Sequence, residues 1–99
     1  MNLETLRKFT HQLNQIAQKH GINKLYVFGS IARGEATSKS DVDFLVEMQP
    51  KASLFGIAGF SFEAEKLLSS KVDVVPMSIL PELKDRYFVQ NIQREAVVL

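Results

Sequence analysis

The first third of the chain combines one helical pattern with one strand-like pattern of apolar residues. Mostly apolar positions recur at steps of three and four, namely Leu3, Leu6, Phe9, Leu13, Ile16 and His20. This spacing predicts one amphipathic helix, and Gly21 stands where a helix commonly ends. The β-prone run 24–28 follows and stops abruptly at a Gly-Ser pair. A short helix is then expected over residues 30–35.

The rest of the chain repeats this alternation of strand and helix. The predicted elements are a strand at 41–47, a helix at 54–68, a third strand at 72–76 and a last helix from Pro81 to about Asn91. Gly56 and Gly59 lie inside the second of these, and each costs about 1 kcal/mol relative to alanine in a helix interior. The alternation predicts an α/β (α+β) fold in which helices pack on a small mixed β-sheet.

Composition and charge narrow the class of protein. A chain of 99 residues favours one domain spanning 1–99, and 45% hydrophobic residues suffice for a core. The absence of cysteine excludes disulfides and thiolate metal sites, so any metal would be held by oxygen or imidazole ligands. The formal net charge of +1 argues against a dedicated nucleic-acid binder. No apolar run resembles a signal peptide or a membrane span, so we expect a cytoplasmic protein.

The Gly29-Ser30 pair lies at a predicted strand-to-helix turn, which suits phosphate binding. Glycine lets the backbone approach a ligand closely because it has no Cβ. The helix start offers unpaired N–H groups and the positive end of the helix dipole. Ser30 adds a hydroxyl donor, and Arg33, one turn further on, is able to reach an anion. We therefore predict an anion site built by Gly29, Ser30 and Arg33.

Two aspartates follow this turn after ten further residues, at the start of the second predicted strand. Alternate residues of a strand share a face, so Asp41 and Asp43 project the same way, about 6.6 Å apart, while Val42 points to the opposite side. Two carboxylates on one face repel each other, and a divalent cation is the usual remedy. Oxygen ligands completed by water and substrate phosphate are typical of Mg²⁺.

A third acid, Asp73, interrupts the apolar run 72–75. An ionised aspartate between valines in a half-buried strand is costly unless something pairs with it. If this strand lies beside that of Asp41 and Asp43, all three carboxylates converge. In a site with two metal ions, two of these carboxylates would then bind both ions. Asp73 would bind one ion and activate an attacking hydroxyl, as in two-metal displacement at phosphorus. The alternative is an edge-strand acid that faces solvent.

The glycine-serine turn and the paired aspartates, spaced in this way, resemble the signature of the DNA polymerase β-like nucleotidyltransferase superfamily. Within it, segments 28–36 and 71–75 are similar to the minimal nucleotidyltransferase (MNT) family, and the similarity covers nearly the whole chain. The resemblance implies the polymerase β-like nucleotidyltransferase fold. Members are often the antitoxin of a two-gene module whose toxin is a HEPN-domain ribonuclease. The family precedent is transfer of AMP from ATP to a tyrosine of that toxin, which silences it.

The resemblance also implies roles for the predicted site residues. Those that would bind the phosphates of ATP are Gly29, Ser30 and Arg33. Those that would be catalytic residues and ligands of Mg²⁺ form the acidic set Asp41, Asp43 and Asp73. Many relatives have a basic residue where this chain has Ile31, which leaves the triphosphate contacts to Arg33 and Lys39. Relatives usually fill the 54–68 helix with stronger helix formers, so a looser helix is expected here.

Several of these residues also have ordinary structural explanations. Arg33 would equally form a surface ion pair with Glu35 or Glu4, which contributes little to stability. His11 and His20 are expected at the surface or at a helix end rather than as ligands. The segment 54–62 is more apolar than a one-faced helix requires, so we expect part of it, together with residues 97–99, to form an exposed docking surface.

These observations favour transfer of AMP to a hydroxyl of a protein partner, a HEPN-type toxin by family precedent. The domain is small for an elaborate small-molecule pocket, which fits a macromolecular acceptor. One alternative is an antitoxin that neutralises its partner by occlusion alone, although a pure binder has no use for clustered carboxylates. The other is nucleotidyl transfer to a small molecule, with an acceptor site shared across a dimer. A homodimer and a hetero-oligomer with the partner both fit the sequence.

Overall fold

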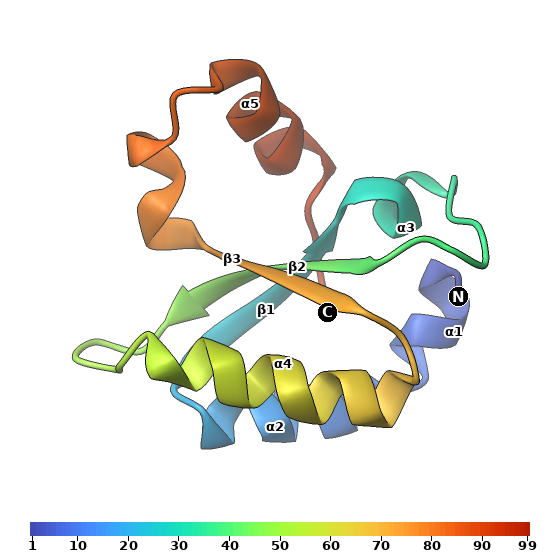
Figure 1. The fold of residues 1–99 in the computed structure, drawn as a ribbon, viewed down its shortest axis with the longest axis horizontal. Helices are drawn as coiled ribbons and strands as arrows, with labels where there is room; N and C mark the ends of the chain where they lie inside the picture. The colour runs from blue at the N-terminus through green and yellow to red at the C-terminus, as the bar shows by residue number, and fades with distance from the viewer.

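A mixed four-stranded sheet forms the centre of the molecule in the computed structural model, which describes all residues from 1 to 99 (Figure 1). The strands are β1 (Ile22–Phe28), β2 (Val42–Met48), β3 (Val72–Pro76) and β4 (Val97–Val98). Their spatial order is β3-β2-β1-β4, with β1 antiparallel to both β2 and β4 and with β2 parallel to β3. The predicted α/β architecture with a small mixed sheet is confirmed.

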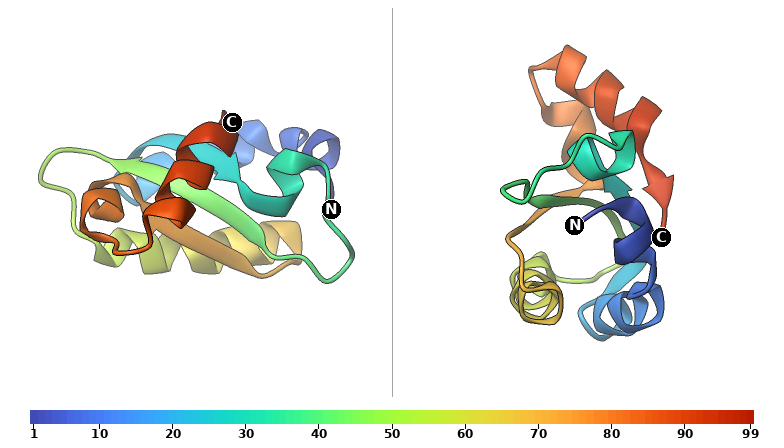
Figure 2. Two further views of the ribbon diagram at one scale, coloured as in Figure 1. Left: turned by 90° about the horizontal axis from the view of Figure 1, so that it is seen from above. Right: turned by 90° about the vertical axis from the view of Figure 1, so that its right-hand side faces the viewer.

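Helices cover both faces of this sheet. On one face, α2 (Thr10–Lys19) and α4 (Phe55–Leu68) lie side by side, and the other face carries α5 (Arg86–Glu95) and the 3₁₀-helix η1 (Met77–Glu82) (Figure 2). The short helix α3 (Gly29–Arg33) follows directly on β1 and ends at Gly34, whose φ of 77° is the left-handed conformation favoured at a helix end. Helix α4 connects the parallel strands β2 and β3, as a crossover connection requires.

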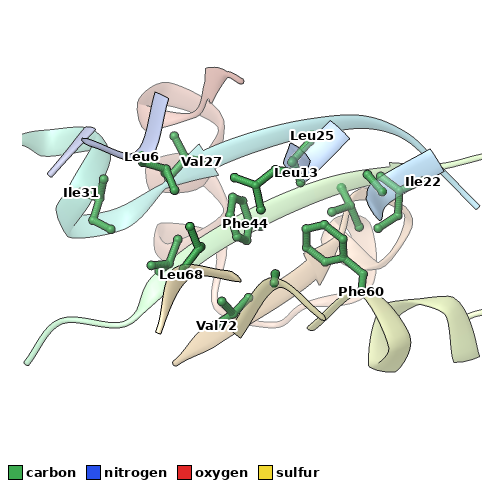
Figure 3. Close-up of a cluster of buried hydrophobic side chains, with 14 residues drawn as sticks. Leu6, Leu13, Ile22, Leu25, Val27, Ile31, Phe44, Phe60, Leu68 and Val72 are labelled. Carbon is green, nitrogen blue, oxygen red and sulfur yellow. The ribbon is translucent and has the colours of Figure 1, made fainter. Parts of the chain in front are cut away.

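The alternation of residues along β2 divides the core into two clusters. Val42, Phe44 and Val46 are fully buried towards α2 and α4, where the Phe44 and Phe60 rings meet edge to face (Figure 3). Leu45 faces the opposite way and packs with residues of η1 and α5. Because Asp43 is two residues from Leu45, the strand period places it on the α5 side of the sheet. The core thereby determines which face receives the carboxylate.

The N-terminal stripe was expected to form one helix, but the structure contains two. Helix α1 (Leu3–Arg7) begins at Asn2, whose side chain accepts a hydrogen bond from the Thr5 amide at 2.8 Å. It ends where the Thr10 hydroxyl donates to the Arg7 carbonyl at 2.8 Å. Threonine side chains that bond to nearby backbone compete with the helical ladder, which explains the break. Leu6 before this break and Leu13 after it are both fully buried, so the apolar stripe continues across the break.

The last helix also begins later than predicted. Pro81 lies inside η1 rather than opening α5, and α5 starts at Arg86. The reason is the N-cap Asp85, whose carboxylate accepts a hydrogen bond from the Phe88 amide at 3.0 Å. Strand β4 was not predicted, because two residues are too few for a periodic pattern. It forms by pairing with Tyr26 and Val27 of β1.

The glycines of α4 have a packing role instead of making this helix loose. A Cβ at Gly56 would overlap the His20 carbonyl oxygen, and one at Gly59 would overlap the His20 ring. Helix α4 runs without interruption over 14 residues, and its glycines let it approach the end of α2 closely. His20 ends α2, as expected for a helix-end residue, and its Nε2 pairs with Glu63 of α4.

None of the helices is long and apolar enough to cross a membrane.

Candidate active site

The turn after β1 joins the two motifs that are separated in the sequence. Gly29 has a φ of 75°, a conformation that favours glycine, and it opens α3 directly after β1. Phe28 is paired with Asp43 in the β1–β2 register. A Cβ at position 29 would overlap the Asp43 carboxylate, so the missing side chain of Gly29 leaves room for that carboxylate. Glycine is therefore required here both by the backbone and by its neighbour.

The sheet register brings two of the predicted acids together. Asp43 and Asp73 are direct partners in the parallel β2–β3 pairing, so both lie on the α5 face of the sheet. Asp43 is half-buried and Asp73 is exposed, and both line the same cleft. Asp41 is half-buried but does not line that cleft. The pairing begins at Val42, so Asp41 precedes the segment that the register holds.

The pKa of Asp43 reflects this crowding of acids. The pKa is raised from 3.8 to about 6, mainly by burial and in addition by the negative charges of Asp73 and Asp41. The positive charge of Arg33 lowers it. Removal from water and like charges both disfavour the ionised form of a carboxyl. A cation placed among these carboxylates would therefore relieve an existing electrostatic cost.

A cleft of about 610 Å³ lies over these residues. It is lined by parts of β1, α3, β2, β3 and α5, namely Phe28, Gly29, Ser30, Arg33, Asp43, Asp73, Val74, Val75, Phe88, Asn91, Ile92 and Glu95. A volume of this order is typical of pockets for small ligands and cofactors. The lining includes the acidic side chains of Asp43, Asp73 and Glu95 and the aromatic rings of Phe28 and Phe88. All three predicted anion-binding residues and two of the three acids therefore meet at one cavity.

The sequence left open whether Arg33 belongs to the site or only forms a surface ion pair, and the structure shows features of both. It lines the cleft, and it also donates from Nε to Glu35 Oε1 at 3.1 Å. The predicted pair with Glu35 is thus present, and no pair forms with Glu4. A second partner was not predicted: Nη1 of Arg33 lies 3.1 Å from Oε1 and 3.0 Å from Oε2 of Glu95 in α5. The hydrogen bond to Glu35 and, to a smaller extent, the hydrogen bonds to Glu95 raise the pKa of Arg33.

Helix α5 supplies the wall of the cleft that sequence reasoning did not identify. Phe88 is 42% exposed, and its ring meets that of Phe28 edge to face with centroids 6.4 Å apart. Asn91 and Glu95 follow at steps of three and four, so they share one helix face with Phe88. A helix was predicted for this segment, but nothing in the sequence indicated that it packs beside the Gly29 turn. Lys39 is exposed and does not line the cleft.

The donor set at this cleft fits a hard divalent cation. Asp43 and Asp73 present carboxylate oxygens from neighbouring strands, and such oxygens are the ligands that Mg²⁺ prefers. Mg²⁺ usually keeps several waters and is bound by one or two carboxylates together with substrate phosphates. No three acidic or histidine side chains are placed to share one ion by themselves. The remaining ligands in such a site would come from water and from a phosphate-bearing substrate.

The chain has counterparts among known proteins. The sequence pattern of the family described as "Nucleotidyltransferase domain" matches residues 5–99. A candidate protein adenylyltransferase of Methanocaldococcus jannaschii is 38% identical over 87 residues, which are 87% of this chain and 90% of that protein. Protein adenylyltransferase MntA of Thermococcus cleftensis is 37% identical over 71 residues, 72% of each chain.

Solved structures agree with this relationship. The structure of a candidate minimal nucleotidyltransferase aligns with a TM-score of 0.80 and 36% identity, covering 100% of this chain and 97% of that one. A toxin-antitoxin structure with AMP-PNP aligns with a TM-score of 0.68 and 18% identity, covering 89% of this chain and 69% of that one, and shares the fold. The chain therefore belongs to the nucleotidyltransferase domain family, in which it is a minimal nucleotidyltransferase.

Proposed function

We propose that this enzyme transfers AMP from ATP to a hydroxyl group of a partner protein in a magnesium-dependent reaction. The observation that carries the proposal is the meeting of Gly29-Ser30 with Asp43 and Asp73 at one cleft. A phosphate-binding turn and paired carboxylates are the two parts that nucleotidyl transfer needs in contact. The two relatives named as protein adenylyltransferases, at 38% and 37% identity, support a protein acceptor.

The nucleotide would lie along the length of the cleft. Gly29 and Ser30 would bind phosphate oxygens through backbone N–H groups and the serine hydroxyl, and Arg33 would contact the outer phosphates. Phe88 offers a partly exposed aromatic surface in the same cleft. An aromatic ring is a general platform for a nucleobase, because every base has a π-face that can stack. We therefore assign the base to Phe88.

Magnesium would be held by the acidic set, with Asp43 and Asp73 facing the cleft and Asp41 beside them. When bound, the ion would neutralise charge on the phosphates and stabilise the leaving oxygen. The protein itself would align the acceptor. Its hydroxyl oxygen would form a bond to the α-phosphorus while the bond to the β-phosphate oxygen breaks. Pyrophosphate would leave, and Asp73, the more exposed acid, would accept the hydroxyl proton.

A HEPN-type toxin is our proposed acceptor, with the tyrosine of the family precedent as its target residue. One related structure is described as a tri-AMPylated HEPN toxin of Shewanella oneidensis in complex with an MNT antitoxin, and it shares this fold at 14% identity. The open side of the cleft suits a protruding side chain of a macromolecule. In this role the enzyme is an antitoxin that silences its partner in the cytoplasm.

A second candidate function is neutralisation by binding alone. It is favoured by the exposed apolar residues at the start and on the outer face of α4, namely Leu54, Phe55 and Phe62. Exposed apolar surface on a small protein usually marks an interface. The same surface would also serve an enzyme that must dock its protein substrate. The two functions therefore differ only in their need for the acidic set.

The decisive test is incubation of the purified protein with Mg²⁺, labelled ATP and the product of the neighbouring gene, followed by intact mass measurement. We expect the partner to gain one or more AMP units with the wild type and none with Asp41→Asn or Asp43→Asn. Asp85→Asn is a matched control, because it removes an acid away from the cleft and asparagine retains the helix cap. A stable complex without any mass gain would contradict transfer and favour occlusion.

A further inference from the structure

An ion pair bridges two walls of the cleft. Arg33 ends α3, which begins at the Gly29-Ser30 turn, and Glu95 ends α5, which forms another wall. Both carboxylate oxygens of Glu95 lie within hydrogen-bond distance of Nη1 of Arg33, at 3.1 and 3.0 Å. Both residues line the cleft. The contact therefore ties the proposed phosphate end of the site to the helix that covers it.

The surroundings of Glu95 indicate that this contact is more than a surface pair. Its side chain is only 15% exposed, whereas the side chain of Glu35, the other partner of Arg33, is 65% exposed. A carboxylate in the last turn also lies at the negative end of the helix dipole, which is an unfavourable place for a negative charge. Its one side-chain partner in the structure is Arg33. The position of this acid is thus explained by the arginine and not by helix α5.

We propose that Glu95 is a positioning residue that holds the Arg33 guanidinium ready for the outer phosphates of the nucleotide. This inference rests on the proposed function, because it concerns the same binding site. A guanidinium has five N–H donors in a fixed plane. Nε of Arg33 donates to Glu35 and Nη1 donates to Glu95, while Nη2 makes no hydrogen bond in the structure. The unused Nη2 donors are the ones available to phosphate oxygens, in a plane that the two acids fix.

This arrangement lowers the cost of ordering a long side chain on binding. An unrestrained arginine would lose its rotamer freedom when it grips a phosphate, and this loss weakens binding. Held by Glu95, the arginine is already restricted before the nucleotide arrives. The opposite effect of an acid at this position would be competition, in which Glu95 must release Arg33 before phosphate can bind. The two effects predict opposite changes in affinity when the acid is neutralised.

The experiment measures the dissociation constants of Mg·ATP and of AMP by titration calorimetry. Removing a charged hydrogen bond in Arg33→Ala is expected to weaken Mg·ATP binding about 10- to 100-fold. We expect Glu95→Gln to weaken it about 3- to 10-fold, with less than about a twofold effect on AMP, which lacks the outer phosphates. Glu95→Asp should recover part of the loss. Glu82→Gln is the control, because it neutralises an exposed acid outside the cleft that makes no contact with Arg33.

A double variant separates positioning from a structural role. If Glu95 acts through Arg33, then Arg33→Ala combined with Glu95→Gln should bind Mg·ATP no more weakly than Arg33→Ala alone. Additive losses, an equal loss for AMP, or tighter Mg·ATP binding by Glu95→Gln would each overturn the proposal. Failure of the wild type itself to bind Mg·ATP would instead overturn the proposed function. Circular dichroism of each variant verifies that the fold is retained.

Discussion

Replacing Asp43 with asparagine should stabilise the protein in the absence of metal, even though it removes a proposed catalytic residue. In the fold, the pKa of Asp43 is raised from 3.8 to about 6, first by burial and then by the charges of Asp73 and Asp41. Because the folded state holds this proton more tightly, the stability of the wild type falls as the pH rises from about 4 to about 6. Above that range the full cost of ionising Asp43 is present.

The size of this effect follows from the pKa shift. A rise of about two units corresponds to about 3 kcal/mol, at 1.36 kcal/mol per unit. Asp43 is only half-buried, so solvent screening reduces this to about 1 kcal/mol. For a domain of this size, 1 kcal/mol shifts the melting temperature by roughly 4–8 °C. Asparagine stays neutral at every pH, so the variant should melt about that much higher than the wild type at pH 7.5.

Thermal unfolding in EDTA, followed by circular dichroism at pH 7.5 and pH 4, is the assay. The gain of Asp43→Asn over the wild type should nearly vanish at pH 4, where the wild-type carboxyl is protonated. Glu82→Gln, which neutralises an exposed acid outside the cleft, should give no such pH-dependent gain. Added Mg²⁺ should raise the melting temperature of the wild type more than that of the variant. An equal shift at both pH values, or a loss of stability at pH 7.5, would refute the reasoning.

Three further substitutions test other parts of the structure. Gly29→Ala should abolish AMP transfer and lower the free energy of unfolding by at least about 1 kcal/mol, because it adds an overlap with the acidic site to an unfavourable φ. Gly34→Ala, with the same φ but open space, should cost less in denaturant titrations and spare transfer. Phe88→Ala should weaken ATP binding by about 1–3 kcal/mol in calorimetry, while Tyr87→Ala beside it should not. Phe55→Asp, at a side chain that is 89% exposed, should leave the melting temperature unchanged but weaken the partner complex measured by gel filtration.

The sequence contained enough information to predict the strand-borne part of the site. Asp41 and Asp43 were both predicted to lie on one strand. The structure places Asp43 in β2 beside Gly29 and Asp73, whereas Asp41 precedes β2, which begins at Val42. Local patterns suffice for Asp43 because a strand alternates strictly, and for Gly29-Ser30 because this turn directly follows β1. The roles of these residues in metal binding and catalysis stay predictions. So does the role of Ser30 in phosphate binding.

The helical wall could not be predicted, because it depends on contacts between distant segments. Glu95 is 62 residues from Arg33, and no local pattern couples the two. The start of α5 was also misplaced, since a proline and a capping aspartate compete as helix-start signals and the aspartate determines the boundary. Helix propensity predicted that the glycines of α4 would loosen this helix. Their presence is explained instead by the close approach of His20 from another helix, which leaves no room for a Cβ.

The parallel register of β2 and β3 has a consequence for how accurately the acids are aligned. Asp43 and Asp73 face each other only while Val42 stays opposite Val72 and Phe44 opposite Val74. A slip by one residue would turn a carboxylate into the apolar core on the far side and a core residue out to the cleft. Such an error is penalised by the burial of the valines and phenylalanine, so the spacing of the two acids is maintained without any polar contact between them. Packing on the opposite, apolar face of the sheet therefore determines how accurately the two carboxylates of this site are aligned.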